Sequence, residues 1–330
     1  MRAFDYIRPA DAGAAIHEAG KADTRFLAGG TTLLDLMKCG VERPARLVDL
    51  THLPGLNEIA VSDGAVRIGA LAKMSHVADD ARVKAAAPAI SEALWLAASA
   101  QLRNMATIGG NLMQRTRCTY FRDTAAYQNC NKRNLGSGCA AMDGVNHNHA
   151  VLGTSASCIA TNPGDLVVAL VAFDALVRIS GSADRVVPVE QFYRLPGDRP
   201  DLEHELAPGE LITGIEIPLS DALRRSHYMK VRDRASYAFA AASAAVGLVL
   251  EADGRTIREA RVGLGGVATR PWRARAVEQA LLGQPLDEAV IRSAALHAVD
   301  GAQARSDNAY KIALVPKVVA RALMTVGGIA

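Results

Sequence analysis

The chain has 330 residues, of which 50% are hydrophobic and 22% charged, and its formal net charge is +3. This composition is typical of a globular protein of about two domains and excludes a mainly disordered chain. So small a net charge argues against a basic nucleic-acid-binding surface. The sequence contains no apolar run long enough for a transmembrane helix, and the charged N-terminus has no signal-peptide core.

The first hundred residues alternate between strand-like and helix-like segments. Hydrophobic periodicity predicts short strands at 24–30, 45–50 and 65–71 and helices at 31–40 and 88–104. The helix at 88–104 begins with proline, which is favoured in a first turn, and has apolar residues at spacings of three and four.

The periodicity disappears in residues 113–150, which are rich in Arg, Asn, Gly and Cys. A structureless loop of this length is uncommon inside a compact domain, so either it is disordered or something other than an apolar core orders it. Periodicity then returns, with a buried helix predicted at 166–174 and a strand at 175–180.

A stretch rich in Pro, Gly and charge at 195–212 marks the approach to a domain boundary. Beyond it, HYMKV, SAAVGLVLE and REARVGLGG predict strands, and RARAVEQALLG, PLDEAVIRSAALHAV and AYKIALVPKVVARALMTV predict helices. Strands followed by helices are typical of a separate α+β domain.

The segment AGGTTLLDLMK (28–38) places two glycines between a predicted strand and a predicted helix. Glycine lets backbone N–H groups approach an anion closely, and Thr31 and Thr32 can cap the helix or donate hydroxyls to phosphate. The segment is neither the dinucleotide fingerprint GxGxxG nor a P-loop. Taken on its own, the segment is explained better by an ordinary strand–turn–helix.

A second glycine pair lies in RNMATIGGNL (103–112), beside amide and hydroxyl side chains. Bare backbone next to such groups suits a sugar–diphosphate, although a tight turn is again the simpler interpretation. Two such turns together favour a diphosphate cofactor, and they fit a flavin dinucleotide held by several loops better than one held by a single Rossmann loop.

Four of the five cysteines, Cys118, Cys130, Cys139 and Cys158, occur within a short stretch of polar sequence, whereas Cys39 ends an apolar helix and is interpreted as a core thiol. The four lack a CxxC pair, which weakens a zinc site. Four thiolates can instead hold an iron–sulfur cluster, with polar amides tuning its potential. Four unrelated thiols are the alternative.

Basic side chains surround these cysteines and are predicted to offset the negative charge of a thiolate-bound cluster. They are Arg115, Arg117, Arg122, Lys132 and Arg133. His147 and His149 lie in the same segment, where metal binding and a polar loop explain them equally well.

Several segments, in this order, resemble the FAD-binding subunits of the xanthine dehydrogenase and molybdenum hydroxylase family. They are FLAGGTTLLDLMK, IGAL, LRNMATIGGNL, GELITGIEIP and KVRDRASYAFA. The segments TRCTYFRD, CNKR, GSGCAA and CIATNPGDLVVAL resemble, within that family, the FAD and 4Fe–4S subunits of bacterial periplasmic aldehyde oxidoreductases. The resemblance covers essentially the whole chain, and the cysteine-bearing segment is its most specific part.

The resemblance implies an α+β fold with a two-part FAD-binding domain of the vanillyl-alcohol-oxidase (PCMH) type at 1–222. It places a 4Fe–4S loop insertion at about 113–160 in that domain, and a smaller α+β C-terminal domain at 223–330. It also implies cofactor-binding roles for Phe26, Leu27, Ala28, Gly29, Gly30, Thr31, Thr32, Leu33, Asn104, Thr107, Ile108, Gly109, Gly110, Asn111, Asp165, Ile212 and Lys230. Cys118, Cys130, Cys139 and Cys158 match the cluster ligands.

In this family an aromatic residue near the end of the 88–104 helix often covers the flavin ring. This chain has Ala97 and Ala98 there, and Tyr237 is the predicted substitute.

The resemblance further implies an electron-transfer subunit of an aldehyde oxidoreductase, with FAD and a 4Fe–4S cluster as its cofactors. The expected partners are a large subunit with the molybdenum cofactor, a small subunit with 2Fe–2S clusters, and an external electron acceptor, with no nucleic acid and no membrane insertion. No residue of this chain is predicted to be a catalytic acid, base or nucleophile.

A flavin subunit of a related hydroxylase acting on a purine or an aromatic acyl-CoA is the alternative within the family. A free-standing flavoenzyme and a zinc-stapled binding module are the alternatives outside it. Periplasmic localisation is expected, by co-export with a signal-bearing partner, with a cytoplasmic protein as the alternative.

Overall fold

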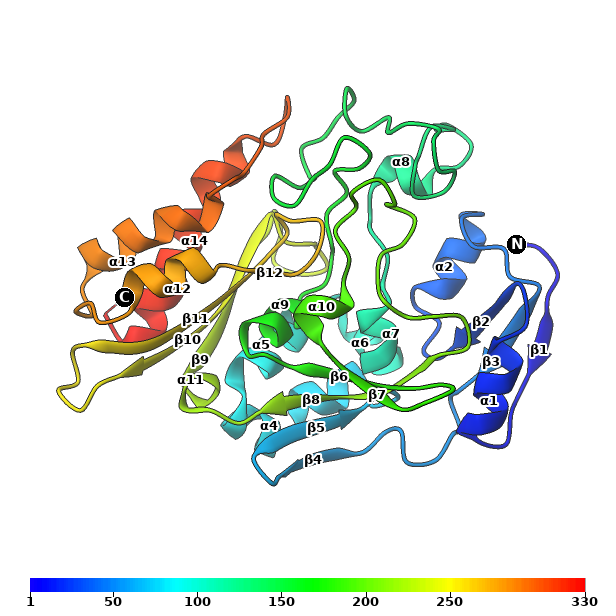
Figure 1. Cartoon of the computed structure of the whole chain (residues 1–330), viewed down its shortest axis with the longest axis horizontal. Coiled ribbons are helices and arrows are strands. Elements are labelled where there is room, and N and C mark those ends of the chain that lie inside the picture. Colours follow the sequence, from blue (N-terminus) through cyan, green and yellow to red (C-terminus); the bar gives the residue numbers. More distant parts are fainter. Residues whose placement is uncertain (330) are drawn as a thin grey trace.

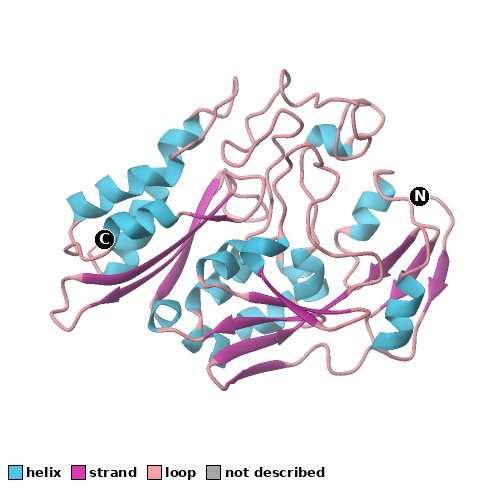
Figure 2. Ribbon diagram, in the orientation of Figure 1, coloured by secondary structure: helices cyan, strands magenta, loops and turns pink. Residues whose placement is uncertain are grey.

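The computed structural model describes residues 1–329, which form three β-sheets with helices packed around them (Figures 1 and 2). The first sheet is parallel, has the order β1-β3-β2 and contains the N-terminal strands. Strand β2 ends just before the glycine pair Gly29-Gly30. The elements are β1 (Asp5–Ile7), α1 (Ala12–Ala19), β2 (Thr24–Leu27), α2 (Leu33–Lys38) and β3 (Arg46–Asp49).

The second sheet is antiparallel and joins segments that lie far apart in the sequence. Its order is β4-β5-β8-β6-β7, so β8 pairs with β5 on one side and β6 on the other. Residues 70–175 therefore leave and re-enter the same sheet, and they carry the second glycine turn and the four clustered cysteines. The strands are β4 (Ile59–Ser62), β5 (Ala65–Gly69), β6 (Leu176–Ser180), β7 (Arg185–Pro188) and β8 (Leu211–Pro218).

Short helices pack beside this sheet. The most deeply buried is α9, of sequence LVVALVA, in which every residue is buried. An apolar run without a polar face has no side to turn toward water, so it lies between layers. The helices are α3 (Met74–Asp79), α4 (Ala81–Ala86), α5 (Pro88–Leu96), α6 (Ala100–Met105), α7 (Ile108–Leu112), α8 (Thr119–Arg122), α9 (Leu166–Ala172) and α10 (Val189–Phe192).

The third sheet is antiparallel, in the order β12-β11-β10-β9, and has helices on both faces (Figure 1). Along β10, Ala244 and Val246 join the core under the C-terminal helices, whereas Ala245 and Val249 join the core that contains α9. The elements are α11 (Asp221–Arg224), β9 (Ser226–Val231), β10 (Ala242–Leu250), β11 (Ile257–Gly265), β12 (Trp272–Arg273), α12 (Arg275–Leu281), α13 (Glu288–Ala295), the 3-10 helix η1 (Leu296–Val299) and α14 (Tyr310–Gly327).

Helix α9 approaches β11 so closely that the strand needs glycine at two positions. A Cβ at Gly263 would lie 2.4 Å from the carbonyl oxygen of Val168, and one at Gly265 would lie 2.4 Å from the Cγ2 of the same valine. The small residues of this strand therefore let the two parts of the chain share one packed interface.

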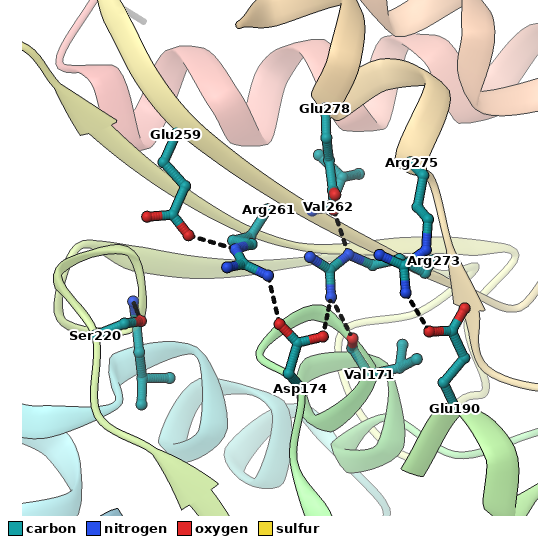
Figure 3. A network of polar contacts seen from close by, with 11 residues as sticks. Val171, Asp174, Glu190, Ser220, Glu259, Arg261, Val262, Arg273, Arg275 and Glu278 are labelled. Atoms are coloured by element: carbon teal, nitrogen blue, oxygen red, sulfur yellow. Dashed lines mark hydrogen bonds and ion pairs between the residues drawn. The ribbon is translucent and has the colours of Figure 1, made fainter. Parts of the chain in front are cut away.

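Ion pairs stabilise the edge of the interface between α9 and β11 (Figure 3). Asp174, just beyond α9, pairs with Arg261 of β11 and with Arg273 of β12, the latter at 3.0 Å. The Arg273 guanidinium is almost fully buried, pairs with Glu278 and donates to the carbonyl oxygen of Val171 at 2.9 Å. A buried guanidinium with this many partners holds the third sheet in one position against α9.

The predicted helix at 88–104 is wrong as a single helix, because the chain forms α5 and α6 with a break between them. Ala98 adopts φ +50°, and the Ser99 side chain caps α6 by accepting from the amide of Leu102 at 3.3 Å. The buried Arg103 guanidinium donates to the carbonyl oxygen of Ala97 at 2.8 Å and stacks on the ring of Trp95. The cap of Ser99 and the contacts of the buried Arg103 side chain thus overrule the helix propensity of the alanines.

The other predicted strands and helices are confirmed, with ends shifted by a few residues, and so is the α+β class. Residues 113–164 contain only α8 and are otherwise loop (Figure 2). The predicted domain boundary after residue 222 falls inside α11 and stays a prediction. Within residues 1–329, none of the helices combines the length and hydropathy that a membrane span requires.

Candidate cofactor site

A cavity of about 660 Å³ lies where the first glycine turn, the second glycine turn and the cysteine-bearing segment meet. This volume is within the range of small-molecule and cofactor pockets. The predicted site residues that line it are Phe26, Ala28, Gly29, Gly30, Thr31, Thr32, Leu33, Thr107, Gly109, Gly110 and Ile212. The sequence-predicted turns therefore meet in one place, although no ligand tests their roles and those roles stay predictions.

The first turn presents backbone N–H groups that have no partner. Among the described residues, the amides of Gly29, Gly30, Thr31 and Thr32 find no hydrogen-bond acceptor. Thr32 occupies the N-cap position of α2, but its side chain does not cap the helix, so that expectation is wrong and its hydroxyl stays free. Consecutive free amides form a concave site for an anion such as a diphosphate.

Glycine is required in this turn for two different reasons. Gly30 has φ +73°, a conformation that favours glycine, and a Cβ at Gly29 would lie 2.1 Å from the carbonyl oxygen of Met105. The second contact means that the two glycine turns touch through their backbones. The first turn is therefore held in shape by the segment that leads into the second.

The second turn uses most of its own donors internally. The amides of Ile108 and Gly109 donate to the carbonyl oxygens of Ala72 and Ala70, at 3.0 and 2.8 Å, and Thr107 caps α7. One acceptor is left over, because Oδ1 of Asn111 is buried without a partner. This turn therefore offers a ligand fewer free N–H groups than the first turn, and it contributes to the cavity mainly through the surface of Thr107, Gly109 and Gly110.

Six predicted cofactor residues do not line the cavity with their neighbours: Leu27, Asn104, Ile108, Asn111, Asp165 and Lys230. The last two form a buried ion pair, in which Lys230 Nζ lies 2.8 Å from Asp165 Oδ2. Tyr228 donates to the other carboxylate oxygen at 2.6 Å. Burial raises the pKa of Asp165, and the ammonium of Lys230 opposes that shift.

Tyr237, the predicted cover of the flavin ring, also lies away from the cavity wall. Its side chain is 55% exposed, it has φ +53°, and its ring lies under the guanidinium of Arg234. Its role as the cover of the flavin ring stays a prediction.

The structure brings Cys118, Cys130, Cys139 and Cys158 together as free thiols. Cys130 and Cys139 face each other in a two-residue antiparallel bridge. Burial raises the pKa of Cys118 to about 12 and that of Cys158 to about 11, and the charges of neighbouring cysteines add to both shifts. The four thiols are therefore near enough to repel one another when ionised, which is costly without a cation among them.

Backbone amides point at several of these sulfurs. Cys158 receives a hydrogen bond from the amide of Ala160 at 3.4 Å. The backbone amides of Phe121 and Tyr120 lower the pKa of Cys118 against the stronger effect of burial, and the amide of Ala141 does the same for Cys139. N–H groups directed at thiolate sulfur are the usual outer sphere of an iron–sulfur centre.

No three His, Cys, Asp or Glu side chains among residues 1–329 converge as ligands of one metal ion. The four thiols are thus not arranged as a single tetrahedral zinc site, in which every sulfur lies about 2.3 Å from the metal. Four cysteine thiols are the donor set that a 4Fe–4S cluster takes, and the assignment of such a cluster to this chain stays a prediction.

Most of the basic residues near the cysteines are already paired, which corrects the expectation that they all offset a cluster. Arg115 pairs with Glu42 at 2.8 Å and with Glu203 at 2.7 Å. Arg117 and Arg122 both pair with Asp35. Arg133 donates to the carbonyl oxygens of Tyr120 and Tyr127. These contacts fasten the cysteine-bearing segment to α2 and to the loop before β8.

Lys132 is the basic side chain whose charge reaches a cysteine. It lowers the pKa of Cys158 against the stronger effect of burial, and it pairs with Glu203 at 3.4 Å. Lys132 and Cys158 also line the cavity of the glycine turns. The thiol cluster and the cavity therefore adjoin each other.

The sequence did not distinguish two histidines that the structure separates clearly. His149 is buried, and its Nε2 lies 3.2 Å from the sulfur of Cys118. Burial lowers the pKa of His149 to about 4, with a contribution from the charge of Lys311. His147 is exposed and stacks on the ring of Tyr310. The pattern HNHA contained both, and nothing local says which one turns inward.

Comparison with known proteins is consistent with this arrangement. Residues 2–220 match the family described as the FAD binding domain in molybdopterin dehydrogenase, and residues 226–326 match the CO dehydrogenase flavoprotein C-terminal domain. The chain is 43% identical over 332 residues to the aldehyde oxidoreductase FAD-binding subunit PaoB of Escherichia coli, covering 98% of each. It is 27% identical to the carbon monoxide dehydrogenase medium chain of Hydrogenophaga pseudoflava, covering 97% of this chain and 96% of that one.

Among solved structures, quinoline 2-oxidoreductase from Pseudomonas putida 86 superposes with a TM-score of 0.76 at 24% identity, covering 99% of this chain and 98% of that one. This likeness shows the fold. The family matches and the relative with 43% identity also show the family. The chain belongs to the FAD-binding subunits of the molybdopterin dehydrogenase family and is the flavin subunit of an oxidoreductase of the aldehyde oxidoreductase and xanthine dehydrogenase type.

Proposed function

From this membership we propose that the chain binds FAD in the cavity of the two glycine turns and a 4Fe–4S cluster on Cys118, Cys130, Cys139 and Cys158. It would pass electrons from the 2Fe–2S clusters of a small partner subunit to FAD and on to an external acceptor. A large partner subunit with a molybdenum cofactor would oxidise the substrate. The observation that carries the proposal is the meeting of free amides, paired glycines and four thiols around adjoining sites.

The residues of the cavity support the flavin part of this proposal. FAD, when bound, supplies a carrier that can take up electrons singly and give them up in pairs. The free amides at 29–32 would hold its diphosphate, because consecutive backbone N–H groups can donate hydrogen bonds to an anion. The second turn would form another part of the wall, through Thr107, Gly109 and Gly110.

The thiols support the iron–sulfur part. Buried thiolates need a cation among them, and the surrounding amides are donors for cluster sulfur. Because residues 113–164 hold little regular structure, a cluster would also supply the anchoring that an apolar core supplies elsewhere.

An aldehyde is the proposed substrate class of the whole enzyme, because the relative with 43% identity is the FAD-binding subunit of an aldehyde oxidoreductase. A purine or an aromatic acyl-CoA is the alternative. Purified complex assayed with aldehydes, purines and acyl-CoA esters decides between them. Turnover confined to one of the alternative classes contradicts the aldehyde assignment.

We also propose that the chain reaches the periplasm folded, carried by a signal-bearing partner subunit. Cell fractionation with and without that partner tests the proposal. Recovery of the subunit in the periplasm only when the partner is present supports co-export. Recovery in the cytoplasm under both conditions supports the alternative of a cytoplasmic enzyme.

The cofactor proposal is tested on the assembled complex by visible absorption, FAD release and iron analysis. We expect about one FAD for each copy of this chain and, in the Cys130→Ser complex, a loss of about four iron atoms relative to the wild type. Cys39→Ser is the matched control, because Cys39 lies at the end of α2 and outside the group of four. Equal iron in wild type and Cys130→Ser contradicts the cluster, and absence of FAD contradicts the flavin site.

A further inference from the structure

His149 points a ring nitrogen at one of the four thiols. Its Nε2 lies 3.2 Å from Cys118 Sγ. Among residues 1–329, no other side chain makes a hydrogen bond with any of the four clustered sulfurs, because the remaining contacts come from backbone amides. Cys118 is therefore distinguished from the other three cysteines by a side-chain partner.

The environment of the ring decides which nitrogen carries the proton. Nδ1 of His149 is buried and has no hydrogen-bond partner. A neutral imidazole has one N–H, and a buried N–H without an acceptor is rarer and more costly than a bare lone pair. The proton therefore sits on Nε2, where the sulfur accepts it.

Residues just before α14 hold the backbone of the loop that carries His149. Asn146 and Asp307 exchange hydrogen bonds, the amide of each donating to the side chain of the other at 3.1 and 3.0 Å. The fully buried Asn308 donates to the carbonyl oxygens of His149 and Ala150, at 3.4 and 3.1 Å. The backbone position from which the His149 ring reaches Cys118 therefore depends on residues about 160 positions away.

We propose that His149 is a positioning residue that donates its Nε2–H to the Cys118 thiolate and thereby raises the reduction potential of the 4Fe–4S cluster. The inference rests on the proposed function, since it needs the cluster. A hydrogen bond to a ligand sulfur stabilises the added negative charge of the reduced cluster, so its loss makes reduction harder. The reduction potential of the cluster therefore depends on the segment 306–308 as well as on the cysteine-bearing segment.

The test is a redox titration of the intact complex followed by electron paramagnetic resonance. His149→Phe keeps a flat ring but cannot donate, and we expect its 4Fe–4S potential to shift to more negative values than wild type. His149→Gln places an amide N–H near the position of Nε2, and we expect it to recover part of the shift. His147→Phe is the matched control, because His147 is exposed and contacts Tyr310 rather than a cysteine.

An unchanged potential in His149→Phe, with the wild-type complement of iron, overturns the inference and leaves the cluster assignment standing. A wild-type complex without the 4Fe–4S signal overturns both. A shift in His147→Phe equal to that in His149→Phe also overturns the inference, because it shows a general effect of the loop.

A measurement without substitution covers the case in which His149→Phe loses its iron. The wild-type complex is prepared with ¹⁵N-labelled histidine and with unlabelled histidine, and the reduced cluster is studied by pulsed electron paramagnetic resonance. We expect a weak nitrogen coupling that changes with the label. Spectra that are identical for the two preparations overturn the inference.

Discussion

The cofactor cavity and the cysteine-bearing segment adjoin each other, yet they are built on opposite principles. The cavity wall consists of turns between regular elements, and those elements are anchored in apolar cores. Residues 113–164 have one short helix and are held by ion pairs and by hydrogen bonds of buried amide side chains. The first region has its shape without a ligand, because the elements on either side of its turns are packed into apolar cores and only the amides that face the cavity are left free.

The second region has shape only as far as its polar partners hold it. Buried amides such as Asn146 and Asn308 have hydrogen-bond partners, whereas the four clustered cysteines, two of them buried, are free thiols. Polar networks of this kind stabilise a structure when every member is satisfied and weaken it when one is not. The difference implies that removing a cofactor empties the cavity but loosens the segment.

The largest expected effect follows from removing one thiol. Cys130→Ser is expected to expose residues 113–164 to protease while the core around α9 stays resistant, because the segment has no apolar core of its own. Limited proteolysis followed by mass spectrometry locates the cleavage sites. Cys39→Ser is the control, and a Cys130→Ser segment as resistant as the wild type contradicts the contrast between the two regions.

The pH dependence of the free energy of unfolding tests the contribution of the buried Lys311, whose charge acts on His149 of the cysteine-bearing segment. Burial lowers the pKa of Lys311 to about 8 from 10.5 in the unfolded chain. Between these values the unfolded chain binds more protons, so stability rises with pH from 8 to 10.5, by at most about 3 kcal/mol. Lys311→Met removes this rise, and unfolding at several pH values measures it. Parallel pH profiles for wild type and variant contradict the assignment.

The cavity is expected to be intolerant of a single methyl group in its first turn. Gly29→Ala puts a Cβ against the carbonyl oxygen of Met105, and a clash of about 1–3 kcal/mol weakens FAD binding roughly ten- to a hundredfold. Iron content is expected to stay at the wild-type level. Gly13→Ala is the control, because its Cβ meets only an ordinary contact with Asp11. Fluorescence titration of FAD measures the change.

The smallest expected effect concerns the hydrogen bonds that Asn308 donates to the backbone of His149 and Ala150. Asn308→Ala removes the donor to the carbonyl oxygens of His149 and Ala150, at about 1 kcal/mol for each lost hydrogen bond. Faster iron release from the complex is the readout. Asn148→Ala, at an exposed position of the same loop, is the control. Equal rates of iron release for the two variants would show that the Asn308 hydrogen bonds do not hold the segment.

Sequence reasoning succeeded where function depends on local chemistry. The glycine turns were found because backbone that approaches a ligand requires glycine, and Gly29 and Gly30 are indeed constrained. The burial of α9 followed from an apolar run with no polar face. The break between α5 and α6 was missed because it depends on Arg103 and Ser99, whose contacts do not follow from periodicity.

The sequence by itself determined the kinds of groups available: paired glycines between predicted strands and helices, and four cysteines in polar sequence. These follow from residue type and spacing within a few positions. Only the tertiary structure decided that Arg115 is neutralised by Glu42 and Glu203, and that His149 rather than His147 meets Cys118. The partners in these contacts lie far apart in the sequence, and the local pattern around one residue does not predict where the other lies in the fold.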